Sequence, residues 1–153
     1  MNYAEDSSGE NFYGTKDPDN LLLPYYNAPA LTAVKRFFKN YVNFKGRASK
    51  SEYWWSVLFV NIVGLVPGVG VVLPAALAGE VGGLLLSLLI MLIVGLALTL
   101  PTLSVSWRRL QDANINGVFA LFIFVFSTIT TIVIGLLSTN AEGRVFDAPA
   151  ARR

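Results

Sequence analysis

Composition and charge exclude a water-soluble globular protein. The chain has 153 residues, of which 54% are hydrophobic and only 14% are charged, whereas a soluble domain carries about 25% charged residues. No charged side chain lies in residues 53–79, 81–107 or 113–141. Each of these stretches is longer than the roughly 20 residues that a membrane-spanning helix needs, so we expect an all-α integral membrane protein.

The residue inventory limits the chemistry that the chain can perform. It contains no Cys and no His, which removes thiolate metal sites, disulfides, haem ligation by His and a Ser-His-Asp catalytic arrangement. We predict no catalytic residue, no cofactor and no metal site, and we expect a protein that is not an enzyme.

Residues 1–29 are polar and rich in turn-forming residues. Five acidic side chains stand against Lys16 alone, which gives this stretch a net charge of −4. No apolar periodicity persists, and the basic start and long apolar core of a signal peptide are missing. The sequence predicts a mobile N-terminal tail.

Residues 30–52 carry the opposite charge, with six cations against Glu52 and a net charge of +5. Apolar side chains recur at helical spacing from Leu31 to Tyr41, which predicts an amphipathic helix over residues 31–42 at the membrane interface. The basic side chains then face anionic lipid phosphates; they are Lys35, Arg36, Lys39, Lys45 and Lys50. The alternative is a solvated basic helix that packs on the protein's own surface.

Three membrane spans are predicted to follow, at about residues 50–72, 83–106 and 118–137. Ser49 and Glu52 have the S-x-x-E spacing of a capping box, which marks the start of the first span. Pro67, followed by two nearby glycines, is expected to kink or end that span. The membrane domain thus covers residues 30–138, and residues 139–153 form a polar C-terminal tail.

The distribution of Lys and Arg predicts the orientation in the membrane. Eight cations lie in residues 30–52 or directly after the second span, and none lies between the first two spans. We therefore expect a cytoplasmic N-terminus and, with three spans, a C-terminus outside. If the third apolar stretch is a re-entrant hairpin instead, the C-terminus returns to the cytoplasm and its three arginines join the other eight cations.

One cluster of charged residues is predicted where the first two spans meet the cytoplasm. It would gather Arg47, Glu52, Arg108, Arg109 and Asp112 if the two helices pack antiparallel. Guanidinium groups bind phosphate in a bidentate manner, so the cluster could hold an anion or a lipid headgroup. The alternative is an internal ion-pair network that fixes the helix ends.

Two polar residues lie apart from this cluster. Glu80 is the single charge between the first two spans, and we interpret it as a solvated loop carboxylate. Asn61 lies near the middle of the first span, where it could bond to the Ser and Thr residues of the third.

Two sequence blocks resemble a bacterial membrane family known as domain of unknown function 805. The run from Phe37 to Trp54 is similar to the family's F-x-G-R-A-x-R-x-E-[YF]-W opening, and Pro101 to Asp112 is similar to its P-x-x-x-V-x-x-R-R-L-H-D block. The segment from Glu142 to Asp147 is similar to its ending, so the resemblance covers about residues 33–147. Gln111 replaces the family's usual His. The resemblance implies a bacterial inner-membrane protein and no assigned activity.

Together these observations predict a small, non-enzymatic protein of the bacterial inner membrane with a structural or accessory role. Its basic cytoplasmic face would contact anionic lipid or a partner subunit, and no nucleic-acid partner is expected. The alternative is a transport or channel component that acts as a homo-oligomer, since three short helices enclose little space by themselves.

Overall fold

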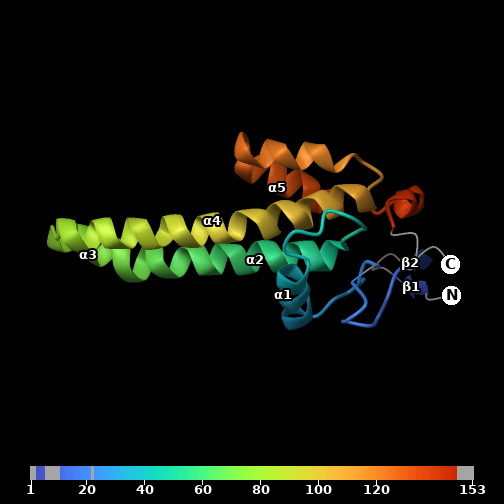
Figure 1. Ribbon diagram of the computed structural model, residues 1–153, viewed down its shortest axis with the longest axis horizontal. Coiled ribbons are helices and arrows are strands. Elements are labelled where there is room, and N and C mark those ends of the chain that lie inside the picture. Colours follow the sequence, from blue (N-terminus) through green and yellow to red (C-terminus); the bar gives the residue numbers. More distant parts are fainter. Residues whose placement is uncertain (1–2, 6–10, 22, 148–153) are drawn as a thin grey trace.

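Two long antiparallel helices dominate the fold (Figure 1). The computed structural model describes residues 3–5, 11–21 and 23–147. The first helical rod consists of α2 (Lys50–Pro67), the π-helical turn η1 (Gly68–Val72) and α3 (Leu73–Ala78); the second is α4 (Val81–Asp112). Both rods are long and apolar enough to cross a membrane, and very few residues of either apolar stretch are buried in the protein.

The boundaries of the two rods follow from local signals. The predicted capping box is confirmed, because Ser49 accepts from the amide of Glu52 and the Glu52 carboxylate accepts from the amide of Ser49. Pro67 was expected to kink or end the span; it ends the regular α-helix α2 but not the rod, because the π-helical turn after it lets the chain continue as a helix to Ala78. The rod ends instead at Gly79, whose left-handed backbone (φ +67°) suits a residue without a Cβ.

The third predicted span is not a single helix, so the three-span prediction is not confirmed. Residues 117–136 form a 3-10 helix, η2 (Gly117–Phe124), and a ten-residue α-helix, α5 (Ser127–Leu136). Both elements lie along the second half of α4 (Figure 1). The chain reverses between them, so that Gly117 lies against Trp107 while the carbonyl of Leu137 accepts a hydrogen bond from Arg109.

The physical reason for this difference lies in the composition of the segment. Every residue from Val118 to Phe126 is apolar, so no periodic face distinguishes one long helix from two short ones. A ten-residue α-helix is about 15 Å long, half the thickness of a hydrocarbon core of about 30 Å. α5 is therefore too short to span a membrane, and two spanning helices remain in the described chain.

The amphipathic segment before the spans forms α1 (Ala30–Lys39), three residues shorter at its end than predicted. It crosses α2 steeply (Figure 1). Ala33 and Phe37 are buried, and the Phe37 ring meets the Phe59 ring of α2 edge-on at 6.1 Å between centroids. One face of α1 thus packs on the protein itself, while Leu31 on another face is 86% exposed.

The segment predicted as a mobile tail packs against the helix ends from Gly14 onward. Leu23, Tyr26 and Ala28 are buried, and the backbone amide of Ala28 donates to the Ser51 hydroxyl at 2.8 Å. The prediction counted charges and missed these apolar and aromatic anchors. Before Gly14, β1 (Tyr3–Glu5) and β2 (Asn11–Tyr13) pair antiparallel.

The C-terminal segment returns to the same end of the molecule. The 3-10 helix η3 (Ala141–Phe146) packs on the end of α4, and the Gly46 amide donates to the carbonyl of Phe146 at 3.1 Å. We call this end the polar end; it comprises residues 14–21, 23–52, 104–117 and 137–147. The opposite end is the turn between α3 and α4.

A buried ionic network as the candidate functional site

Arg36 and Glu52 form a buried ion pair between α1 and the start of α2. The distance from Arg36 Nε to Glu52 Oε1 is 2.5 Å, and the two side chains are 1% and 3% exposed. The remaining Arg36 nitrogens donate to backbone carbonyls of the N-terminal segment, those of Pro18, Asn20 and Leu23. The prediction that Arg36 faces lipid phosphates is therefore wrong, because its charge is satisfied inside the protein.

The second carboxylate oxygen of Glu52 connects three segments of chain. Oε2 accepts from the amide of Ser49 and from the amide of Tyr25, each at 3.0 Å. A residue that the sequence marks as a helix cap thus also fixes the N-terminal segment. Such charge-assisted hydrogen bonds are about twice as strong as neutral ones.

Arg47 holds the C-terminal segment through a two-pronged pair with Asp147. Its Nε and Nη2 lie 2.7 and 2.8 Å from the two carboxylate oxygens, and its Nη1 is 3.5 Å from Asp112 Oδ1. Burial alone would lower the pKa of Arg47, but the hydrogen bonds to Asp147 and the neighbouring carboxylate of Asp112 raise it above its ordinary value. Arg47 is therefore a fixed positive charge.

Asp112, the last residue of α4, is the centre of the second half of the network. Its carboxylate is fully buried and pairs with Arg109, one turn earlier on the same helix. It also accepts from the hydroxyls of Tyr26 at 3.0 Å and Thr139 at 2.8 Å. Burial, together with the nearby negative charge of Asp112, raises the pKa of Tyr26, so the phenol stays neutral and acts as a donor.

Arg108 differs from the other buried arginines, because no carboxylate of the described residues forms an ion pair with it. It is 2% exposed, and its one described hydrogen bond runs from Nη2 to the carbonyl of Arg47 at 3.2 Å. Its Nε has no hydrogen-bond partner among the described residues, and neither has the Nε of Arg109. The C-terminal end of α4 favours these cations through the negative pole of the helix dipole.

All five residues of the predicted cluster lie buried at the polar end. Arg47, Arg109 and Asp112 contact one another through Asp112, whereas Glu52 pairs with Arg36 rather than with Arg108 or Arg109. Arg108 reaches the cluster through the backbone of Arg47. The sequence thus indicated which residues gather at this end and did not indicate that Glu52 pairs with Arg36.

Several network members were not identified from the sequence; they are Tyr26, Thr139 and Asp147. They lie on segments whose proximity is decided only by folding. The Arg47–Asp147 pair, for example, joins residues that are 100 positions apart.

A further member of the network, Gln111, connects α4 to the segment before α2. With its amide nitrogen turned toward that segment, it donates to the carbonyls of Phe44 at 3.1 Å and Gly46 at 2.6 Å.

The lysines of the polar end, unlike its four buried arginines, remain at or near the surface. Lys35 and Lys39 lie 3.8 and 2.5 Å from Asp19, with side chains 59% and 39% exposed. Lys45 is exposed and Lys50 is half-buried. The hydrogen bond from Lys39, and the charges of both lysines, lower the pKa of Asp19.

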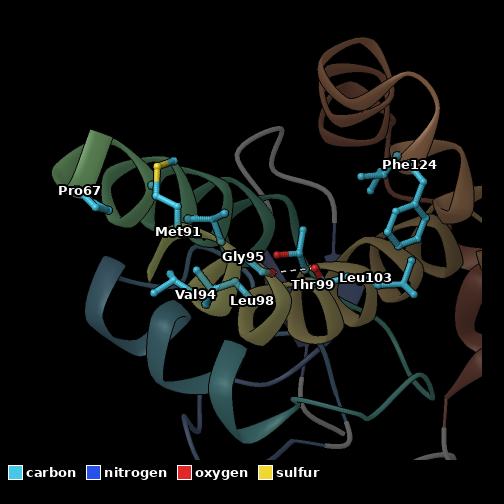
Figure 2. Close-up of a pocket in the computed structure, with 12 residues that line it drawn as sticks. Pro67, Met91, Val94, Gly95, Leu98, Thr99, Leu103 and Phe124 are labelled. Atoms are coloured by element: carbon cyan, nitrogen blue, oxygen red, sulfur yellow. Dashed lines mark hydrogen bonds between the residues drawn. The ribbon is translucent and has the colours of Figure 1, made fainter. Parts of the chain in front are cut away.

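A cavity of about 300 Å³ lies between α2, α4 and η2 at membrane depth (Figure 2). Its walls are almost entirely apolar, with Met91, Val94 and Leu98 on α4 and Phe124 at the end of η2. Thr99 also lines it, and its hydroxyl donates to the carbonyl of Gly95 in its own helix at 2.7 Å. The cavity therefore offers a ligand apolar contact and few polar groups.

The predicted bond between Asn61 and the Ser and Thr residues of the third apolar stretch is not formed. Asn61 is exposed, and its amide nitrogen donates to the carbonyl of Val57 in its own helix at 2.8 Å. Glu80 is exposed in the turn between α3 and α4, as the sequence suggested.

Comparison with known proteins gives this arrangement a family. Residues 41–148, which hold most of the network, match the family described as "Protein of unknown function (DUF805)". The chain belongs to this family. It is 41% identical over 87 residues to the inner membrane protein YhaI of Escherichia coli (strain K12), which covers 57% of this chain and 66% of YhaI.

A second relative has the same cellular location in its name. The inner membrane protein YhaH of the same strain is 31% identical over 94 residues, which covers 59% of this chain and 70% of YhaH. No solved structure matches the chain. The two apolar helices and these relatives make the DUF805 chain a bacterial inner-membrane protein.

Proposed function

We propose that this DUF805 protein is a small, non-enzymatic structural or accessory protein of the inner membrane whose polar end lies against anionic lipid headgroups. The observation that carries this proposal is the different placement of its two kinds of cation. Four arginines, Arg36, Arg47, Arg108 and Arg109, lie inside and are held by carboxylates and carbonyls, whereas the lysines of the same end lie at or near its surface. The network builds a rigid platform, and the lysines make its outer face basic.

The distribution of charge supports a cytoplasmic position for the polar end. Every Lys and Arg that the structure describes belongs to it, while Glu80 is the charge at the opposite turn. Cytoplasmic segments of inner-membrane proteins are enriched in Lys and Arg. Because η2 and α5 double back, the segment after Leu137 shares this side and adds Arg144 to it.

The orientation of α1 supports contact with the membrane interface. It crosses the spanning helix α2 steeply, so it runs roughly along the membrane surface when α2 crosses the bilayer (Figure 1). The face of α1 that carries Phe37 packs against the protein. Leu31 and Phe38 remain 86% and 44% exposed beside Lys35 and Lys39. This combination of apolar and cationic side chains suits the headgroup region.

The state of the titratable groups supports a role other than catalysis. The carboxylates of Glu52, Asp112 and Asp147 are each engaged by a buried arginine, and the Tyr26 phenol donates to one of them. Groups held in this way stabilise the ends of helices. An enzyme would instead need such groups at the wall of a pocket that admits a substrate.

Lipid retention tests the proposal. The variant with Lys35, Lys39, Lys45 and Lys50 all changed to Gln is compared with the wild type after mild-detergent extraction, with native mass spectrometry of bound lipids. We expect the ratio of retained phosphatidylglycerol to phosphatidylethanolamine to fall several-fold, since each cation near the surface contributes about 1 kcal/mol. Lys16→Gln, which removes one exposed lysine outside residues 30–52, is the control for the loss of a single surface charge and should lower the ratio much less than the fourfold change. An unchanged ratio in the fourfold variant would reject the proposal.

The alternative is a homo-oligomeric transport or channel component. It is favoured by the large apolar flank that the two rods leave exposed, which could pack against further subunits. The cavity beside α4 is almost entirely apolar, however, and gives a polar solute no path through one copy. Mass spectrometry of the proteins that copurify with the tagged chain separates the two: a complex with other proteins supports the accessory role, and a closed ring of more than two copies of this chain alone supports transport.

A further inference from the structure

One amide on the lipid-facing surface of α2 has an acceptor without a partner. Asn61 lies seven residues beyond Trp54, which places it about 10 Å deeper along the helix. Its Nδ2 donates to the carbonyl of Val57, and its Oδ1 accepts no hydrogen bond from any residue that the structure describes. The side chain is exposed, and its immediate neighbours Val60 and Ile62 are apolar.

Two hydroxyls at the start of α5 also lack a hydrogen-bond partner among the described residues. Ser127 and Thr128 are exposed, and within the described chain their hydroxyls have no hydrogen-bond partner. Phe126, the residue before them, supplies no side-chain cap to the helix. They lie close to the depth of Asn61, because nearby Phe124 lines the same cavity as Val60, the neighbour of Asn61 (Figure 2).

Lipid cannot satisfy these groups at this depth. The hydrocarbon core contains no hydrogen-bonding solvent, so polar side chains there bond across helices instead. The surface around Asn61 also permits close approach by another helix. A Cβ added to Gly64, three residues farther along α2, or to Gly68, the first residue of η1, would meet nothing within 4 Å. Small residues at such spacing let helix backbones come together in membranes.

We propose that a second copy of this chain packs against this surface of α2 and pairs with Asn61 across the interface. Two copies inserted in the same direction carry Asn61 at the same depth, so a two-fold axis along the membrane normal brings the two amides to one level. An amide has both donors and an acceptor, so it complements a copy of itself. The hydroxyls of Ser127 and Thr128 provide further donors near this level in each copy.

The absence of Cys from the chain makes disulfide cross-linking a direct test. Leu65 lies one turn from Asn61 on the same side of α2, and Leu92 is an exposed leucine of α4; they are 63% and 58% exposed. Each is changed to Cys in the full-length protein, and native membranes are treated with a mild oxidant. We expect a disulfide-linked dimer from Leu65→Cys and little from the matched control Leu92→Cys. Equal yields, or a disulfide from Leu65→Cys to a different protein, would overturn the proposal.

A second comparison isolates the amide itself. In the Leu65→Cys background, Asn61→Leu should reduce the dimer yield about threefold or more, whereas Asn61→Gln, which keeps an amide, should restore most of it. Asn61 is exposed in the single copy, so neither change should impair folding, and size-exclusion profiles in detergent check this. A dimer yield that Asn61→Leu leaves unchanged would contradict pairing through Asn61. The outcome is independent of lipid retention by the lysine variants.

Discussion

The two ends of this molecule are built on opposite principles. The polar end buries four arginines and three carboxylates together, in contact with both the N-terminal and the C-terminal segment of the described chain. The remainder of the two helical rods buries almost nothing within the protein and leaves its leucines, isoleucines and valines exposed. Water and lipid explain the difference, because the bilayer can solvate the rods, whereas the protein must itself satisfy every charge that it buries. Substitutions should therefore lower the free energy of unfolding strongly at the polar end and only slightly along the rods.

Loss of the Asp112 carboxylate should have the largest effect. Asp112→Ala would leave Arg109 without its carboxylate, weaken the site of Arg47, and orphan the hydroxyls of Tyr26 and Thr139. We expect it to destabilise the fold by about 3–5 kcal/mol, as for other broken buried ion pairs. Unfolding in mixed detergent and SDS micelles measures this. Glu80→Ala is the control and should stay within about 0.5 kcal/mol of the wild type; equal losses would show that the network is not a stabilising feature.

The second-largest effect concerns the two adjacent arginines, whose substitution should lower the stability by different amounts. Arg109→Met breaks a pair with a buried carboxylate and should destabilise the fold by about 3 kcal/mol. Arg108→Met removes a buried cation that has no carboxylate partner in the described part of the chain, and it should cost less than about 1 kcal/mol. The double change of Arg108 and Arg109 to Ala should lower the folded yield in membranes more than Glu80→Ala. If Arg108→Met were the more damaging of the two, Arg108 would have a role that these contacts do not include.

Glycines should show the same contrast on a smaller scale. A Cβ at Gly117 would lie 2.2 Å from the Trp107 ring, and one at Gly135 would lie 2.5 Å from the Trp54 ring, whereas one at Gly95 in α4 would meet nothing within 4 Å. Gly117→Ala and Gly135→Ala should each cost about 1–3 kcal/mol through overpacking. Gly95→Ala should be neutral or slightly stabilising, since Ala is the better helix former. Midpoints of SDS-induced unfolding compare the three, and equal shifts would show that η2 and α5 are not packed as described.

The smallest effect concerns pH. Burial raises the pKa of Tyr26 above its ordinary value of 10.0, so the unfolded chain loses this proton first as the pH rises. The stability that the phenol contributes is complete below pH of about 10 and declines above it. The advantage of the wild type over Tyr26→Phe should therefore shrink steadily as the pH rises above about 10. Both proteins contain the same lysines, so subtracting their free energies of unfolding at each pH cancels the effect of lysine titration. A difference that stays constant with pH would contradict a buried, neutral Tyr26.

Part of the site was predictable because its signals are local. Ser49 and Glu52 lie three residues apart, and their spacing correctly predicted the start of α2. The cations and carboxylates at the ends of the first two apolar stretches were expected to converge, and Arg47, Arg109 and Asp112 do so. The prediction that Arg36 faces lipid was wrong, because α1 places Arg36 inside the protein, where it pairs with Glu52, while Lys35 and Lys39 stay outside. Adjacent positions on a helix face different directions, and only packing decides which of them is buried.

The sequence by itself determined that this chain is a membrane protein, where its first helical rod begins, and to which family it belongs. These properties follow from long uncharged stretches, a four-residue capping box and two conspicuous blocks of residues, none of which depends on distant contacts. The tertiary structure decided that residues 117–136 form two short helices rather than one span, and that Tyr26 and Asp147 meet the ends of α2 and α4. A uniformly apolar segment has no periodicity that fixes its path, and an ion pair between residues 100 positions apart exists only once the chain has folded.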